Sequence, residues 1–148
     1  MRSFVIHGEP VAKGRPRFNR YSGRAFTPEK TINYENLVKM EYLSVYPNEK
    51  PYPKDVPLSV DIKAYFPIPS STSKKKREKM LGEEIRHTKK PDADNIAKSC
   101  LDSILGIAYE DDSSVVDLRV SKWYSDQPRV EMVISEVDMI PLPFTEID

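Results

Sequence analysis

The chain has 148 residues, and 23 Lys and Arg side chains balance 23 Asp and Glu side chains, so the net charge argues against a general nucleic-acid coat protein. The length fits one domain with an ordinary hydrophobic core, the single Cys100 excludes an intramolecular disulfide framework, and two His with one Cys are too few for a structural zinc site. Because no apolar run approaches the roughly 18–20 residues that cross a bilayer, and no signal-peptide core is present, we expect a reduced, cytoplasmic protein without a membrane partner.

The first part of the chain predicts a strand, a loose hairpin and a helix. Residues 2–11 alternate apolar and polar side chains until Gly and Pro interrupt them, which is typical of a strand. Residues 12–28 are rich in Gly, Arg and aromatic side chains, and a Ser-Gly pair marks a turn, so we expect a loop or loose hairpin. Thr27 and Pro28 indicate a helix start, with Thr27 as the N-cap and Pro28 as the first helical residue, and the helix should continue to about residue 46.

The middle of the chain predicts a half-buried strand and a basic helix. Residues 57–69 place apolar side chains at alternate positions, as a strand with one buried face does. Residues 70–84 begin with Ser and Thr and continue into a run of Lys and Arg, which predicts a capped helix with almost no apolar face. Residues 85–91 should form a loop that leads to the next helix.

The last part of the chain contains the clearest helix pattern. Over residues 92–105 apolar side chains recur at helical spacing, and a glycine follows. Residues 115–125 and 128–137 predict two strands joined by a two-residue turn as a hairpin, and the tail at 141–148 has no clear pattern. The order of elements predicts a single α+β domain, in which helices cover a mainly antiparallel or mixed sheet.

Basic residues concentrate in two segments, and acidic residues concentrate in a third. Residues 1–30 contain seven Lys and Arg against two acids, residues 70–90 contain eight against three, and residues 91–148 contain four against thirteen. This separation favours a polyanionic partner, although each basic run taken alone also fits a solvated surface. The first run alternates with Phe and Tyr, which suits phosphate contacts and base stacking. The candidate DNA-binding residues are Lys13, Arg15, Arg17, Arg20, Arg24, Lys74, Lys75, Lys76, Arg77, Lys89 and Lys90.

Two acidic pairs next to the basic segments carry the strongest chemical signal. Asp92 and Asp94 lie at the start of the last predicted helix, and Asp111 and Asp112 precede a strand. Helix capping is the alternative explanation for the first pair, and a turn preference is the alternative for the second. An EF-hand loop is excluded because Ile and Ala occupy positions where it needs a ligand and a glycine. A divalent-metal site for phosphoryl chemistry would account for both pairs, since Mg²⁺ prefers carboxylate oxygens.

A lysine follows the first acidic pair on the same helix. Lys98 lies one turn after Asp94, and Asp102 lies one turn further. The three side chains could form a ladder of weak surface ion pairs, or Lys98 could stabilise negative charge at a scissile phosphate. The spacing leaves both alternatives open.

These residues form a familiar pattern. The sequence P-D-A-D-N-I-A-K-x3-D-x8-D-D, which ends at Asp112, resembles the RusA family of Holliday-junction resolvases. The motifs K-G-R-P-R-F at 13–18 and T-P-E-K-T-x-x-Y-E at 27–35 are similar to those of Gram-positive, phage and prophage members. The similarity extends from the first strand to the last. The segment at 70–90 is longer and more basic than in the shortest members, so its DNA contacts do not carry over.

The resemblance implies a homodimeric, Mg²⁺-dependent endonuclease, with Mn²⁺ as a substitute ion, that makes paired nicks in four-way DNA junctions during recombination and repair. Asp92, Asp94 and Asp112 match the catalytic metal-binding carboxylates, Lys98 matches the catalytic lysine, and Asp111 matches a less critical neighbour in the metal-binding set. The resemblance also implies one RusA-like domain over residues 1–148. A nuclease for flaps or forks and a non-catalytic DNA-binding protein are the alternatives.

Overall fold

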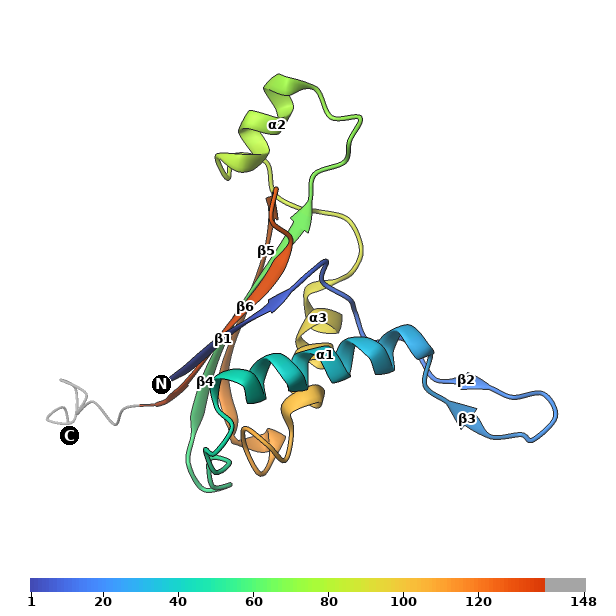
Figure 1. The fold of residues 1–148 in the computed structure, drawn as a ribbon, viewed down its shortest axis with the longest axis vertical. Coiled ribbons are helices and arrows are strands. Elements are labelled where there is room, and N and C mark those ends of the chain that lie inside the picture. The colour runs from blue at the N-terminus through green and yellow to red at the C-terminus, as the bar shows by residue number, and fades with distance from the viewer. Residues whose placement is uncertain (138–148) are drawn as a thin grey trace, which may run out of the picture.

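The computed structural model describes residues 1–137, so the tail at 141–148 lies outside the described residues. The architecture is α+β, as predicted, with helices packed on a mixed sheet (Figure 1). In chain order the elements are β1 (Arg2–His7), β2 (Arg17–Phe18), β3 (Ala25–Phe26), α1 (Glu29–Val45), β4 (Leu58–Pro67), α2 (Lys74–Leu81), α3 (Ala93–Ile104), a 3₁₀ turn (Asp112–Ser114), β5 (Val115–Ser125) and β6 (Arg129–Glu136).

The main sheet has the strand order β1-β6-β4-β5. β4 pairs antiparallel with β6 and parallel with β5, and β1 pairs antiparallel with β6. The predicted hairpin between 115–125 and 128–137 is therefore wrong, because β5 and β6 lie on opposite sides of β4. The alternating apolar side chains of β4 are all buried, which favours the central position. The short connection between β5 and β6 is long enough to cross the roughly 10 Å taken up by one intervening strand.

Helices α1 and α3 pack against each other and cover one face of this sheet (Figure 1). Ile96, Cys100 and Ile104 recur at helical spacing and are buried, as the sequence predicts for α3. They share the hydrophobic core with Val38 and Tyr42 of α1. Burial of this stripe leaves the polar side of α3 and its N-terminal end at the surface.

Two helix boundaries differ from their predictions. Thr27 is not the N-cap of α1: Pro28 occupies that position with a non-helical ψ of 141°, and its carbonyl accepts the first helical N–H bonds. α2 is shorter than the predicted 70–84 because it begins after Ser73, whose hydroxyl accepts the backbone N–H of Lys76. Met80 is its buried residue, so the expectation of almost no apolar face is confirmed.

Two parts of the molecule extend away from the sheet and its covering helices (Figure 1). The hairpin formed by β2 and β3, with Gly23 at φ 67° in its turn, confirms the predicted loose hairpin and projects beyond the N-terminal end of α1. The basic helix α2 lies at the far end of β4 and β5, in a different direction. None of the described helices combines the length and apolar character needed to span a membrane.

Candidate functional site

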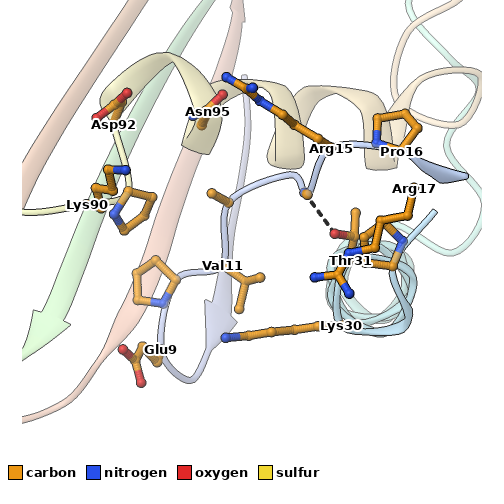
Figure 2. A pocket seen from close by; sticks show the side chains of 15 residues that line it. Glu9, Val11, Arg15, Pro16, Arg17, Lys30, Thr31, Lys90, Asp92 and Asn95 are labelled. Carbon is orange, nitrogen blue, oxygen red and sulfur yellow. Dashed lines mark hydrogen bonds between the residues drawn. The ribbon is translucent and has the colours of Figure 1, made fainter.

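A cleft of about 860 Å³ lies between the loop after β1, the start of α1 and the start of α3 (Figure 2). Arg15, Arg17, Lys30 and Lys90 contribute cationic side chains to its lining, and Asp92 contributes a carboxylate. Three of these cations were predicted DNA contacts, and the structure brings them to the same cleft as Asp92. A cleft with this charge distribution can hold a phosphate backbone beside a carboxylate.

Gly14 fastens the arginine-bearing loop to α1. Its backbone N–H donates to the Thr31 hydroxyl at 2.8 Å, the bond drawn in Figure 2. A Cβ atom at this position would lie 2.7 Å from the same oxygen and 3.0 Å from Cγ of Pro28, so only glycine permits the approach. The glycine therefore sets the positions of Arg15 and Arg17 relative to α1.

Lys13 links three parts of the fold. Its ammonium group donates to the Asp102 carboxylate at 2.6 Å and lies 3.6 Å from the Glu35 carboxylate, so it joins the loop to α3 and α1. The hydrogen bond to Asp102 holds the pKa of Lys13 above its ordinary value. Lys13, a predicted DNA contact, is thus engaged by carboxylates of its own chain. The two motifs at 13–18 and 27–35 meet in this contact.

The first acidic pair stands at the N-terminal end of α3. Asp92 occupies the N-cap position, but its side chain makes no capping hydrogen bond within the described part of the chain. Asp94 lies in the first turn, and both residues are exposed. The Asp92 carboxylate is therefore not used to cap the helix. Both carboxylates also lie where the helix dipole stabilises negative charge.

The second acidic pair has two different environments. Asp111 accepts hydrogen bonds from the backbone N–H and the hydroxyl of Ser113, at 2.9 and 2.8 Å, and caps the 3₁₀ turn. These bonds hold the pKa of Asp111 below its ordinary value. The turn-forming alternative is therefore confirmed for Asp111. The side chain of Asp112 makes no such bond among the described residues and is exposed.

The structure places the two acidic pairs at opposite ends of α3. Asp112 follows Tyr109, whose backbone pairs with Leu105 and Gly106 directly after α3 and whose hydroxyl donates to the carbonyl of Leu101. A helix of this length spans about 18 Å. Within residues 1–137 no three His, Cys, Asp or Glu side chains are close enough to hold one metal ion. A single chain thus does not bring Asp92, Asp94 and Asp112 together, and their shared metal role stays a prediction.

Lys98 is exposed on the polar side of α3. Among the described residues its ammonium group forms no ion pair within 4 Å, and Asp102 pairs with Lys13 instead. The ladder of ion pairs between Asp94, Lys98 and Asp102 is therefore not formed. Lys98 is available to a bound anion next to the first acidic pair.

The segment before Asp92 is anchored to the end of β5 by contacts that the sequence did not reveal. The guanidinium of Arg86 lies 3.2 Å from the ring centre of Trp123 and donates to the carbonyl of Lys122. The Lys122 ammonium donates to the carbonyl of Lys89 at 2.6 Å. Burial lowers the pKa of Lys122, and the negative charge of Asp92 opposes this shift in part. These contacts set the approach to Asp92.

His87 packs within the same segment. Its ring stacks on Phe66 at 3.7 Å and meets Tyr124 edge-on. Burial, helped by the charges of Lys122 and Lys89, lowers the pKa of His87 to about 4. The ring is therefore a neutral packing element near neutral pH.

The remaining predicted DNA contacts lie outside the cleft. Arg20 and Arg24 belong to the hairpin of β2 and β3 and are exposed. The cluster Lys74, Lys75, Lys76 and Arg77 lies on and at the start of α2. Lys30 and Lys122 are not among the residues predicted from the sequence to contact DNA. Lys30 belongs to the motif at 27–35, so this motif could have indicated it. The position of Lys122 near Asp92 depends on the strand register, which the sequence does not reveal.

The donor set at the N-terminal end of α3 suits Mg²⁺ in part. Mg²⁺ is commonly held by one or two carboxylates together with substrate phosphates and water. Asp92, at the N-cap of α3, and Asp94, in its first turn, supply two exposed carboxylates next to a cationic cleft. Asp112 of the same chain lies too far away to complete the set.

Comparisons with known proteins give a consistent assignment. The family model described as endodeoxyribonuclease RusA matches residues 7–135, which includes the cleft, α3 and both acidic pairs. A protein of Bacillus subtilis (strain 168), named "Uncharacterized protein YqaN", is 41% identical over 142 residues. That alignment covers 90% of this chain and 95% of the relative.

Proposed function

The chain belongs to the RusA endodeoxyribonuclease family, and from this premise we propose that it is a Mg²⁺-dependent endonuclease that resolves four-way DNA junctions. It acts as a homodimer that makes paired nicks, in DNA recombination and repair, and Mn²⁺ can replace Mg²⁺. Two nicking sites related by a two-fold axis suit a junction, whose strands are related in the same way.

One observation carries this proposal. A free carboxylate, Asp92, lies in a cleft whose lining also includes Arg15, Arg17 and Lys90. A carboxylate alone would repel the phosphate backbone of DNA, and the cations offset that repulsion. The cleft would thus position a phosphodiester of the DNA next to the Asp92 carboxylate, a metal-binding group.

The side chains have distinct parts in the reaction. Asp92 and Asp94 hold the metal ion, and the cleft cations bind the flanking phosphates and orient the strand. When bound, Mg²⁺ supplies Lewis-acid polarisation of the phosphate and a water of lowered pKa for in-line attack. Lys98, which extends from the next turn of α3, stabilises the negative charge that develops at the phosphate.

A cleavage assay tests the proposal. Labelled four-way junction, flap, fork and linear duplex are incubated with the protein in Mg²⁺ and in EDTA. We expect the protein to make symmetric nicks in the junction in Mg²⁺ and none in EDTA. DNA ligase should be able to reseal the nicked ends. Cleavage confined to flaps or forks would assign another branched substrate, and binding without Mg²⁺-dependent cleavage would identify a non-catalytic DNA-binding protein.

A further inference from the structure

The hairpin of β2 and β3 presents aromatic side chains that the rest of the fold does not cover. Every residue from 15 to 27 is exposed. Within this stretch Tyr21 is 100%, Phe18 76% and Phe26 48% exposed. A single exposed apolar side chain is ordinary on a protein surface, but three aromatic rings on one short hairpin indicate a binding site.

Hydrogen bonds within the hairpin hold its tip in one shape. The side-chain oxygen of Asn19 accepts the backbone N–H groups of Tyr21 and Ser22, at 2.8 and 3.3 Å. The backbone of Asn19 also closes the turn, because its N–H donates to the carbonyl of Arg24 and its carbonyl accepts the N–H of Gly23. Tyr21 thus lies in the middle of an ordered turn with its ring in solvent. Such an ordered element loses less conformational entropy when it binds a partner.

The charge of the hairpin indicates a polyanionic partner. Arg17, Arg20 and Arg24 carry three positive charges, and residues 12–28 contain no Asp or Glu. Arg17 lies opposite Phe26 in the two-stranded ladder, so a guanidinium and an aromatic ring share one face. Cations interleaved with aromatic rings suit a nucleic acid strand, in which phosphates alternate with bases. Arg17 also lines the cleft, so the hairpin continues the cationic surface that holds the DNA there.

The aromatic rings require an accessible base face. In a linear duplex the neighbouring base pairs cover both faces of each base, and a protein reaches phosphates, sugars and base edges. At a branch point the stack of base pairs is interrupted, so a side chain can reach a base face. Separating a base from its neighbour also costs least where pairing is already disturbed. Branched DNA therefore offers the hairpin a contact that a linear duplex lacks.

We propose that the tip of this hairpin is a base-stacking element, in which Tyr21 stacks on an unstacked base at the branch point and Arg20 and Arg24 bind the adjoining phosphates. The cleft holds the strand beside Asp92, and the hairpin, which projects beyond the start of α1, contacts the same DNA further along (Figure 1). The hairpin thereby adds affinity for branched DNA that a linear duplex does not receive. The inference rests on the proposed function for its substrate, branched DNA, but it does not depend on cleavage.

Binding measurements test the stacking contact without any nuclease assay. Fluorescence anisotropy in EDTA gives the affinities for a four-way junction, a duplex with a bulge of unpaired bases and a linear duplex. We expect Tyr21→Ala to weaken binding of the junction and the bulged duplex on the order of 10-fold and to leave the linear duplex unchanged. Tyr21→Phe keeps the ring and should bind all three as the wild type does.

The matched control is Met40→Ala, which removes another apolar side chain, 68% exposed on α1. It should leave all three affinities unchanged. Because Tyr21 is fully exposed, Tyr21→Ala should also keep the thermal unfolding midpoint of the wild type. An equal loss of affinity for the linear duplex, or no loss for any DNA, would overturn the stacking role.

Salt dependence separates stacking from contact with phosphates. Tyr21→Ala removes no charge, so the slope of log affinity against log salt concentration should stay at the wild-type value on the junction. Arg20→Ala removes one phosphate contact and should lower that slope by about 0.9. If Tyr21→Ala lowered the slope as much as Arg20→Ala, the tyrosine would act by placing the arginines, which contradicts the stacking role.

Photochemical cross-linking locates the base that Tyr21 contacts. 5-Iodouracil reacts on irradiation with an aromatic ring stacked on it, so a junction carrying it at the branch point should cross-link to the tryptic peptide of residues 21–24. The same base in the middle of a junction arm should not label this peptide. Equal labelling from both positions, or none from the branch point, would overturn the inference. A wild type that binds junctions but does not cleave them would reject the nuclease function, and the binding and cross-linking results would still decide the role of Tyr21.

Discussion

At the scale of single residues, Asp111 and Asp112 are adjacent but differ in their hydrogen bonds. Asp111 is engaged by Ser113, whereas the described structure leaves the Asp112 side chain unbonded. We expect Asp112→Asn to abolish junction cleavage and leave binding intact or tighter, because less negative charge then opposes the phosphates. Asp111→Asn should retain most activity because an amide oxygen can still accept both bonds. Cleavage rates under saturating enzyme measure the effect on catalysis, and junction affinities in Ca²⁺ measure the effect on binding. The opposite ranking would assign the metal role to Asp111.

The role of Lys98 can be tested by substituting this residue alone. It forms no ion pair among the described residues, so Lys98→Ala should leave the thermal unfolding midpoint almost unchanged. A role at the transition state predicts a loss in single-turnover cleavage on the order of 10²-fold, with junction affinity near normal. Lys98→Arg should rescue poorly because the planar, longer guanidinium cannot replace a compact ammonium. Lys39→Ala, at an exposed lysine of α1, is the control. A near-normal rate for Lys98→Ala would rule out the catalytic role.

At the scale of elements, the segment that leads to Asp92 depends on a neutral His87. An unfolded histidine titrates near its ordinary pKa of 6.5, whereas folding lowers the value to about 4. Protonation therefore favours the unfolded chain: the full stability is present above the unfolded pKa and declines as the pH falls from 6.5 through 4. We expect the thermal unfolding midpoint of the wild type to fall more between about pH 7.5 and pH 5 than that of His87→Phe, which keeps the stacking on Phe66 and does not titrate. Equal declines would show that His87 is protonated in the folded protein.

The sequence predicted elements better than it predicted their pairing. The apolar stripe of α3 and the alternation of β4 are local patterns, and both elements formed where expected. The insertion of β4 between β5 and β6 depends on contacts between distant parts of the sequence. A short polar turn after residue 125 is compatible both with a hairpin and with a connection that crosses over β4. Likewise, spacing marked Asp92 and Asp112 as important, but the distance between them depends on the direction of α3. The contacts of Arg86 and Lys122 follow from strand register and carry no local signature.

At the scale of the whole molecule, positive charge is divided between separate surfaces. Arg15, Arg17 and Lys90 line the cleft, whereas the cluster at 74–77 lies on α2, which extends from the far end of the sheet (Figure 1). A linear duplex bound along the cleft need not reach α2. A branched substrate sends its arms in several directions and can contact both surfaces. The second basic segment therefore adjoins Asp92 through Lys89 and Lys90, while its cluster at 74–77 lies on another surface.

This separation predicts how salt affects the binding of different DNA shapes. Each neutralised phosphate adds about 0.9 to the slope of log affinity against log salt concentration. Replacing Lys74, Lys75, Lys76 and Arg77 by Ala should lower the junction slope by up to about 3–4, if every cation contacts a phosphate, and change the duplex slope much less. Replacing Arg15 and Arg17 by Ala should weaken the binding of both DNA shapes, because the cleft serves both. Fluorescence anisotropy titrations with catalytically inactive Asp92→Asn as the background, between about 50 and 200 mM salt, measure all four slopes. If the α2 substitutions lowered the salt slope equally for junction and duplex, α2 would contact DNA of either shape. Unchanged slopes for both variants would mean that these basic residues are solvated surface and that other side chains hold the phosphates.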